Sequence, residues 1–416
     1  MHSNWSGFLR SFARIGLLSF GGPAAQISLM HSELVDRRRW LDEQQFLGAL
    51  SFCMLLPGPE AMQLATYTGW KLRGVPGGLI AGLLFVLPGA LVILALALAY
   101  ASYGQMPLVQ ALFAGVKAAV VVIVVQALWR LSHKALNGPA HWVLAGLGFV
   151  AIFVLGLPFP AVIAAAALWG AIAAHDQPGG PPPPPTPPGQ TVRTLHTIAI
   201  WGALWAAPIL VVWAAGNTFL LEVALFFSKL AVLTFGGAYA VLAYMTQTVT
   251  QIHGWLSTAQ MIDALGLAET TPGPLILVTQ FVGHLAGYQA GGLSLALAAG
   301  AITLWVTFIP CFLWIFTGAP YLERLLAQPR LKGALAAISA AVVGVIANLS
   351  LWFALHVLFT RVTPARFGPL PDWSSFDATA AGLTALAALL MLILRVGMLP
   401  TLALMAAAGA LVQAMV

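Results

Sequence analysis

The stretch Phe20-Gly21-Gly22-Pro23 recurs as Phe235-Gly236-Gly237-Ala238, and at the same offset Pro57-Gly58-Pro59 recurs as Pro272-Gly273-Pro274 and Trp40-Leu41 as Trp255-Leu256. Both glycine-proline motifs interrupt sequence that is otherwise apolar and helical, whereas a soluble repeat would place such residues along its loops. The pattern predicts two related halves, each with helices that are broken inside a membrane. Gly/Pro breaks at corresponding positions of two halves are the best sequence indication of a transporter's binding site.

The composition indicates an all-α polytopic membrane protein. Hydrophobic residues make up 60% of the chain and charged residues 7%, and the stretches 78–100 and 106–128 exceed the length that spans a bilayer. The net charge of +6 lies in short clusters between apolar runs, which is a topology signal and excludes a nucleic-acid surface. Cys53 and Cys311 lie in separate apolar segments, so we expect two buried free thiols and neither a disulfide nor a metal site.

A proline-rich segment divides the chain. Residues 178–190 read PGGPPPPPTPPGQ and favour an extended polyproline tether, although such a stretch can also be an SH3-type ligand. The expected domains are a first transporter repeat at 1–175, a proline-rich cytoplasmic linker at 176–193, a connecting transmembrane helix at 194–216, and a second, inverted repeat at 217–416.

The apolar pattern repeats from one half to the other and ends each half with a pair of helices separated by a proline. Helical pieces are expected at 8–19, 23–35, 44–56, 60–72, 75–102, 106–132, 141–156, 159–174, 195–215, 218–234, 238–251, 257–271, 275–288, 291–317, 332–359, 377–394 and 399–415.

The basic clusters indicate how the halves face. The first half carries Arg37-Arg38-Arg39 and Lys71 with Arg73 where the second half has no Lys or Arg, so the positive-inside rule predicts inverted repeats with the N-terminus inside and the C-terminus outside. Two topologies remain: about nine full spans plus four re-entrant broken elements, or about thirteen spans. The charges favour the re-entrant version. The loop with Arg361 and Arg366 conflicts with this scheme, which places it outside.

The breaks are suited to an anion. Pro59 and Pro274 fit the first position of a helix, so helices starting there would aim free N–H groups and a positive dipole end at the break. Two such helix starts and the paired glycines could surround a tetrahedral dianion, whereas the alternative is helix packing through small residues. The candidate binding residues are Gly21, Gly22, Gly236, Gly237, Pro57, Gly58, Pro59, Glu60, Ala61, Pro272, Gly273, Pro274, Leu275, Ile276, Thr270 and Thr271.

Gly58 and Gly273 are expected to adopt positive φ and to tolerate alanine less well than Gly78 or Gly292, which begin ordinary spans.

Few charges interrupt the apolar segments. Arg14 and Lys229 occupy equivalent positions and would either attract the substrate or snorkel to an interface. Glu60 and Glu269 lie beside the breaks without acidic counterparts, so they are candidates for proton coupling, with helix capping or ion pairing as the alternative.

Enzymatic function is not expected, because the chain lacks a phosphate-binding GxxxxGK[ST] loop, an HExxH zinc motif and a GxSxG nucleophile elbow. No cofactor or metal is expected either. The energy would then come from gradients, and a dianion leaving a cell that is negative inside gains roughly 4.6 kcal/mol per 100 mV.

The longer context of the motifs resembles a known family. LLPGPEAMQLATYTGW at 55–70, FGGP at 20–23 and AETTPGPLILVTQFVG at 268–283 closely match the repeated motifs of the chromate ion transporter family in its long, two-domain form. The resemblance covers nearly the whole chain, although Ala238 stands where the first copy has Pro23.

This resemblance implies secondary efflux of chromate across the bacterial cytoplasmic membrane, with resistance to chromate as the outcome and sulfate as a related oxyanion. A homodimer is among the assemblies that it allows. Two other functions remain open: an uptake system or channel for sulfate or another oxyanion, and a membrane-embedded structural or sensor subunit that transports nothing.

Overall fold

The computed structural model describes residues 4–174, 189–235, 238–365 and 368–415, and these residues are helical except for one small sheet. Most of the proline-rich linker, together with Gly236, Gly237 and Arg366, lies outside the described residues. The expectation of an all-α polytopic membrane protein is confirmed, and the helix ranges agree closely with those expected from the sequence.

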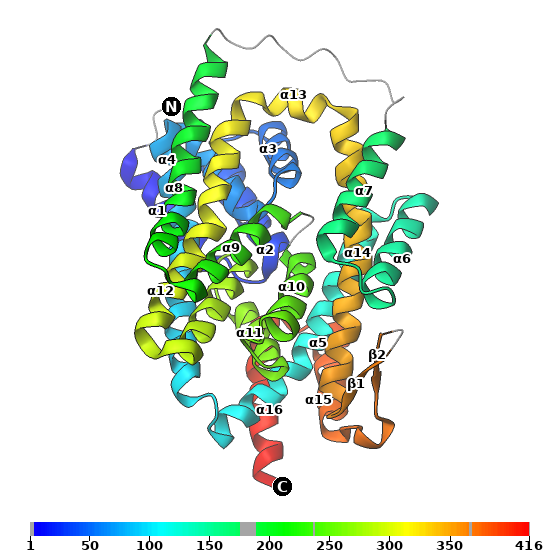
Figure 1. Ribbon diagram of the computed structural model, residues 1–416. Helices are drawn as coiled ribbons and strands as arrows, with labels where there is room; N and C mark the ends of the chain where they lie inside the picture. Colours follow the sequence, from blue (N-terminus) through cyan, green and yellow to red (C-terminus); the bar gives the residue numbers. More distant parts are fainter. Residues whose placement is uncertain (1–3, 175–188, 236–237, 366–367, 416) are drawn as a thin grey trace. The chain divides into compact units, whose positions relative to one another are not determined.

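The elements follow the same order in both halves (Figure 1). The first half contains α1 (Trp5–Leu18), α2 (Gly22–His31), η1 (Ser32–Arg37), α3 (Glu43–Leu55), α4 (Glu60–Tyr103), α5 (Pro107–Ala135), α6 (Pro139–Phe153) and α7 (Phe159–Ala173), and α8 (Gln190–Ala214) connects the halves.

The second half contains α9 (Thr218–Leu233), α10 (Ala238–Gln247), η2 (Thr248–Ile252), α11 (Thr258–Thr270), η3 (Leu275–Leu277), α12 (Val278–Gly318), η4 (Ala319–Tyr321), α13 (Leu322–Ala327), α14 (Pro329–Leu358), β1 (Val362–Ala365), β2 (Gly368–Pro371), η5 (Trp373–Ser375), α15 (Ala378–Ala388), η6 (Leu389–Ile393) and α16 (Met398–Met415).

Among the described residues, six helical stretches are long and apolar enough to cross a membrane: α4, α5, α8, η3 to α13, α14 and α16. Three shorter apolar helices accompany them, namely α6, α7 and α15 with η6. These nine stretches correspond to the full spans expected from the sequence.

The longest helix of each half is a helical hairpin. Helix α4 is interrupted at Arg73 and Gly74, and α12 at Gly291 and Gly292. Gly74 (φ 65°, ψ −159°) and Gly292 (φ 75°, ψ −160°) adopt a conformation that is essentially restricted to glycine. The two segments on either side of each turn pack closely through small residues, so that a Cβ at Gly69 would overlap the carbonyl of Gly77.

The broken segment around Pro57-Gly58-Pro59 in the first half is re-entrant. The ring of Phe8 lies 6.1 Å from the ring of Trp40 and 5.7 Å from the guanidinium of Arg73, so the segment between Trp40 and Arg73 begins and ends on the same side. Helix α3 has only 13 residues, about 20 Å, and is too short to cross a hydrocarbon core of about 30 Å. The re-entrant version of the expected topology therefore holds for the first half.

The two hairpin turns point in opposite directions. A Cβ at Gly78 would meet the ring of Phe316, and one at Gly82 the ring of Phe312, so the Arg73-Gly74 turn lies at the carboxyl end of α12. The Gly291-Gly292 turn begins the second segment of α12, roughly 40 Å from that end at 1.5 Å per residue. The corresponding turns thus lie at opposite ends of one span, which is the inverted arrangement expected from the charges.

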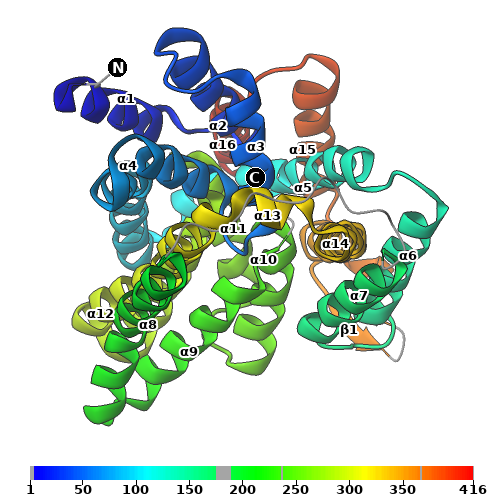
Figure 2. The ribbon, with the colours of Figure 1, turned by 90° about the horizontal axis from the view of Figure 1, so that it is seen from above.

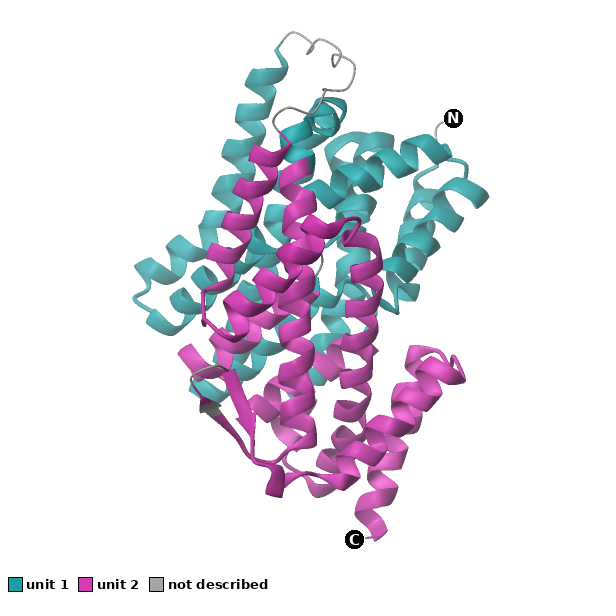
Figure 3. Ribbon diagram, turned by 90° about the vertical axis from the view of Figure 1, so that its right-hand side faces the viewer, with its two compact units in different colours: residues 1–98, 176–238, 271–332 teal, residues 99–175, 239–270, 333–416 magenta. Residues whose placement is uncertain are grey.

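The described chain forms two compact units, shown in different colours in Figure 3. Unit 1 comprises residues 1–98, 176–238 and 271–332, and unit 2 comprises residues 99–175, 239–270 and 333–416. Each unit is therefore assembled from segments of both sequence halves. The boundaries of the sequence repeats remain a prediction.

Unit 1 is built around α12. The indole of Trp305 donates a hydrogen bond to the carbonyl of Leu204 at 2.8 Å, and the hydroxyls of Thr194 and Tyr321 lie 3.0 Å apart, so α8 runs along α12 (Figure 2). Helix α9 packs against α12 as well.

The basic triplet belongs to unit 1 and is ordered by a buried carboxylate. Glu33 accepts hydrogen bonds from Ser11 (2.8 Å), Arg37 (2.9 Å) and Arg38 (3.0 Å). Burial alone would raise the pKa of Glu33, but the hydrogen bonds from Arg38, Ser11 and Arg37 outweigh it and hold that pKa below its usual value.

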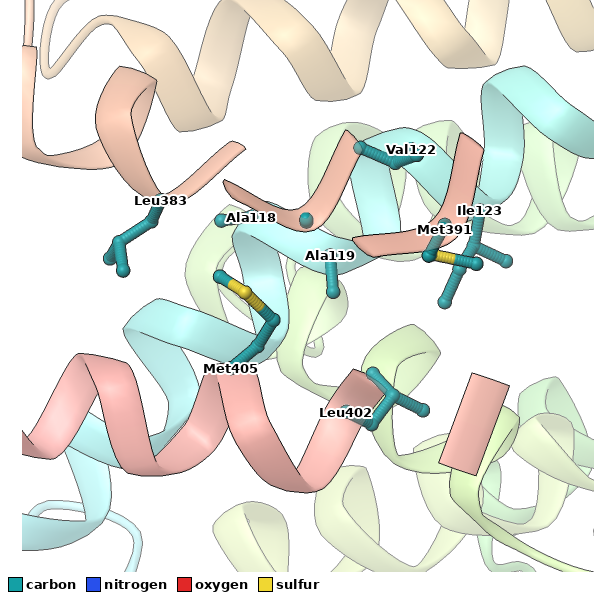
Figure 4. Close-up of a cluster of buried hydrophobic side chains, with 9 residues drawn as sticks. Ala118, Ala119, Val122, Ile123, Leu383, Met391, Leu402 and Met405 are labelled. Carbon is teal, nitrogen blue, oxygen red and sulfur yellow. The ribbon is translucent and has the colours of Figure 1, made fainter. Parts of the chain in front are cut away.

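Unit 2 has its core where α5 meets α15 and α16. Figure 4 shows Ala118, Ala119, Val122 and Ile123 of α5 against Leu383, Met391, Leu402 and Met405. On the other side of this unit, α6 and α7 pack against α14 (Figure 1), where Gly148 faces Ala341 and Gly170 faces Gly333.

One element was not expected. Strands β1 and β2 form an antiparallel hairpin in place of the loop that follows α14. The guanidinium of Arg361 beside this hairpin forms an ion pair with Asp372 at 2.9 Å. Acidic residues count for little in the positive-inside rule, so this ion pair leaves the conflict at this loop in place.

The inverted, re-entrant arrangement predicts the labelling of introduced cysteines. In a Cys53→Ala, Cys311→Ala background, Asp36→Cys and Lys71→Cys should react with an impermeant thiol reagent from the same side, the cytoplasmic one. Gln289→Cys should react only from the other side, because it lies at the opposite hairpin turn. Opposite labelling of positions 36 and 71 would restore the thirteen-span topology, and equal labelling of 71 and 289 would refute the inversion.

Candidate functional site

The breaks of the two halves are joined by a reciprocal pair of backbone hydrogen bonds in unit 1. The N–H of Gly58 donates to the carbonyl of Thr234 at 2.8 Å, and the N–H of Gly273 donates to the carbonyl of Ser19 at 2.9 Å. Ser19 and Thr234 are equivalent residues directly before the two Phe-Gly-Gly motifs. Each Pro-Gly-Pro break is thus bound to the Phe-Gly-Gly break of the other half.

Both central glycines adopt positive φ, as the sequence predicted: 124° at Gly58 and 87° at Gly273. A Cβ at Gly58 would lie 2.8 Å from the side-chain nitrogen of Gln63 and 3.0 Å from the sulfur of Cys311. Alanine at this position would therefore meet both backbone strain and a steric conflict.

Helix α4 begins at Glu60 and η3 at Leu275, in agreement with the predicted ranges 60–72 and 275–288. Pro59 and Pro274 therefore precede the first helical position, and the prediction that they occupy it is wrong. Pro274 has an extended ψ of 137°, which suits an N-cap, and the missing N–H of proline costs as little there as one position later. The amides of Glu60, Ala61, Leu275 and Ile276 then belong to first turns, where no acceptor exists within the helix itself.

These two helix starts meet at one small cavity. About 20 Å³ is open to the centre of a water molecule, which is room for roughly one water. The lining residues are Pro23, Gln26, Gly58, Pro59, Glu60, Ala61, Ala238, Pro274, Leu275 and Ile276. A tetrahedral oxyanion, with five heavy atoms, fits only if the breaks move apart.

Gln26 is the main residue of this site that the sequence analysis missed. Its buried side-chain nitrogen donates to the carbonyls of Gly273 (2.7 Å) and Ser19 (3.3 Å), so it connects the breaks of both halves. The available signal was a single amide in an apolar run after Gly-Gly-Pro, with Val241 at the equivalent position.

Gln63 supports the same site from the first turn of α4. Its side-chain nitrogen donates to the carbonyl of Pro57 at 2.7 Å, and its equivalent in the second half is Val278. Both side-chain amides of the site therefore come from the first half.

Other predicted binding residues lie apart from the cavity. Pro57, Pro272 and Gly273 belong to the breaks without lining it, Gly21 and Gly22 form the left-handed start of α2, and Thr271 is buried. Arg14 and Lys229 are exposed on α1 and α9, and neither lines the cavity. Gly236 and Gly237 lie outside the described residues.

Two predicted residues belong to unit 2, on α11. The hydroxyl of Thr270 donates to the carbonyl of Leu267 at 2.7 Å and so closes the end of the helix. The carboxyl group of Glu269 is buried and accepts a hydrogen bond from the hydroxyl of Tyr239 at 2.8 Å.

A second buried carboxylate on α11 is charge-compensated. Asp263 forms an ion pair with Lys117 of α5 at 3.1 Å and accepts a hydrogen bond from Tyr100 at 2.6 Å. Lys117 was not among the predicted residues, although it is a single cation within an apolar span. Among the described residues there is no cluster of three His, Cys, Asp or Glu side chains that could hold a metal ion.

Inverted repeats with broken helices that meet at one site are the architecture of secondary transporters. The family model described as "Chromate transporter" matches residues 7–171 and 221–412. The chain therefore belongs to the chromate transporter family, and the resemblance noted in its motifs is confirmed. The family and the apolar helices together define a multi-pass protein of the bacterial cytoplasmic membrane.

Curated relatives agree with this assignment. The chain is 33% identical to the chromate transport protein of Pseudomonas aeruginosa over 80% of its own length and 77% of the relative's. It is 30% identical to the probable chromate transport protein of Synechococcus elongatus over 81% of both chains. An uncharacterized transporter of Bacillus subtilis, YwrA, matches 39% of the chain at 31% identity over 93% of its own length. No solved structure matches the chain.

The position of Gln26 predicts a graded effect of substitution. Gln26→Met leaves the carbonyl of Gly273 without this donor and should lower chromate transport roughly tenfold, as expected for about 1–3 kcal/mol of lost hydrogen bonding. Gln26→Glu also adds a negative charge at the cavity and should nearly abolish transport.

Uptake of chromate into inside-out vesicles, normalised to the amount of protein, measures both effects. Gln105→Glu, on an exposed turn, is the matched control and should transport normally. Equal activity of Gln26→Glu and Gln105→Glu would exclude Gln26 from the site.

Proposed function

We propose that this protein exports chromate across the bacterial cytoplasmic membrane and thereby confers resistance to chromate, with sulfate as a second substrate. The observation that supports this proposal most directly is the meeting of two equivalent helix starts, at Glu60 and Leu275, around one cavity. Relatives named as chromate transport proteins supply the substrate class.

The helix starts offer what a dianion needs. Each contributes first-turn backbone N–H groups that have no acceptor within the helix itself, and a helix start carries the equivalent of about half a positive charge. The first segments of α4 and of α12 are buried almost all round, so these donors act in a medium that screens them weakly. The anion can then be bound without a lysine or arginine in contact with it.

Opening of the site would act on the reciprocal hydrogen bonds. The cavity is too small for the substrate, so binding must separate the breaks, and the bonds from Gly58 to Thr234 and from Gly273 to Ser19 connect the parts that would separate. If only one of these two hydrogen bonds breaks at a time, the site would open toward one side of the membrane and then toward the other, as alternating access requires.

The membrane potential suffices as the driving force in this proposal. Outward movement of a dianion is favoured by roughly 4.6 kcal/mol per 100 mV. Arg14 and Lys229, exposed on α1 and α9, would raise the local concentration of the anion at a distance rather than bind it.

Of the two coupling candidates, Glu269 fits the binding of a proton better. Glu60 stands in the first turn of α4, where a carboxylate interacts favourably with the helix dipole. Glu269 is buried with the hydroxyl of Tyr239 as its hydrogen-bond donor and with Arg130 near enough to interact electrostatically, whereas Asp263 on the same helix has Lys117 in contact. A buried carboxyl group without a contacting cation is stable chiefly in its protonated form.

The role of Glu269 predicts a change in pH dependence. In proteoliposomes at a fixed potential, Glu269→Gln should transport chromate at a rate that no longer depends on pH between about 6 and 8, because the amide mimics the protonated acid. Asp263→Asn should instead lower the amount of folded protein, because it leaves Lys117 without its partner. An unchanged pH profile in Glu269→Gln would remove this residue from the coupling scheme.

Substitution of the central glycines, Gly58 and Gly273, tests the site itself. Gly58→Ala and Gly273→Ala should each reduce chromate transport at least tenfold, because a methyl group strains the turn and enters the space beside the cavity. The sequence-based controls Gly78 and Gly292 are unsuitable: a Cβ at Gly78 would meet Phe316, and Gly292 itself has positive φ. Gly48 on α3, where an added Cβ meets nothing within 4 Å, is the matched control.

Transport of labelled chromate and sulfate in oriented proteoliposomes at set potential measures these effects. Accumulation of the anion on the cytoplasmic side, against a potential that is negative on that side, would favour an uptake system. Absence of any oxyanion transport by the unmodified protein would favour a structural or sensor role.

A further inference from the structure

A second and much larger cavity lies within unit 2. It measures about 570 Å³, within the range of small-molecule sites. It is lined by the end of α6, the start of α7, α10 with η2, the carboxyl-terminal part of α14, and the β-hairpin. The stacked rings of Phe159 and Tyr244, 5.6 Å apart, form part of its wall.

Uncharged hydrogen-bonding groups line this cavity. Thr246, Gln247 and Gln251 come from α10 and η2, and Asn348 and His356 from α14. None of the described residues around the cavity is an aspartate or a glutamate.

Such a lining does not suit lipid. Amide side chains such as those of Gln247, Gln251 and Asn348 would go without hydrogen-bond partners against acyl chains, whereas water or a hydrated solute would satisfy them. The absence of carboxylates among the described lining residues removes the repulsion that would keep an anion out.

The cavity lies toward the outer end of α14 under the positive-inside rule. Arg330 and Lys332 begin this helix, and the cavity is lined by its other end, from Val345 to His356. The loop that follows Gln251 contains no Lys or Arg up to Trp255.

We propose that this cavity is an outer vestibule that holds a hydrated divalent oxyanion on its way across the outer boundary of the membrane. The inference rests on the proposed function. Neutral amide, hydroxyl and imidazole donors bind a dianion weakly, and a release site must bind weakly enough for the ion to leave. Chromate and sulfate offer the same acceptor geometry, so the vestibule would not discriminate between them.

Accessibility of an introduced thiol tests the vestibule. Asn348→Cys in a Cys53→Ala, Cys311→Ala background should react from the outside with an anionic sulfonate thiol reagent, and millimolar sulfate, which does not oxidise thiols, should slow the reaction several-fold. Thr363→Cys is the matched control, because residue 363 is exposed on β1 next to Val362, which lines the cavity, and side chains alternate along a strand. Its reaction should not respond to sulfate.

Failure of Asn348→Cys to react with impermeant reagents, together with reaction with a membrane-permeant maleimide, would show that lipid fills the cavity and would overturn the proposal. Reaction without any protection by sulfate would overturn it as well, by showing a water-filled surface that the substrate does not enter.

Transport by Asn348→Asp provides the second test. The carboxylate is nearly isosteric with the amide, so a raised apparent KM for chromate, by roughly tenfold at low salt and less at high salt, would support the vestibule. An unchanged KM at low salt would refute it. If the unmodified protein carries no oxyanion, the proposed function itself fails, and this outcome is distinct from normal transport with an insensitive Asn348→Asp.

Discussion

A backbone amide that is freed from its helix inside a bilayer needs an acceptor within the protein, and in unit 1 the two central glycines find theirs in the opposite half. The bonds from Gly58 to Thr234 and from Gly273 to Ser19 fix where each half ends its first helix and begins its next. The left-handed conformation of the glycines, the position of the helix starts and the small size of the cavity all follow from this exchange of partners.

Close approach of the backbone is the second condition of this arrangement. The carbonyl of Pro272 fits against Gly89 in the middle of the second segment of α4, and that of Leu84 fits against Gly16 of α1. A side chain at either position would push the breaks apart and leave their amides without acceptors. The two interpretations of the small residues, helix packing and the proposed anion site, are therefore compatible, since the packing brings the helix starts together.

Hydrophobic periodicity and the repeated motifs predicted the features that depend on residues close together in sequence. The helix ranges, the positive φ of Gly58 and Gly273 and the inversion of the halves all follow from composition, glycine placement and charge. What escaped prediction depends on pairing between distant residues: Gln26 finds Gly273, and Lys117 finds Asp263, and nothing near either residue in sequence names its partner. The β-hairpin escaped for another reason, because its strands contain three prolines, which weaken any strand signal. The assembly of each unit from segments of both halves is likewise a property of the folded chain.

The hydrogen bonds between the halves also set the order in which the protein can fold and insert into the membrane. Residues around Ser19 and Gly58 leave the ribosome long before Thr234 and Gly273, and domains otherwise fold from the N-terminus during synthesis. Until the second half arrives, the first Pro-Gly-Pro break has polar backbone in the bilayer without its acceptor. The first half must therefore be sheltered by the insertion machinery or remain partly inserted, and its burial is completed only when the last segment of unit 1 has been made.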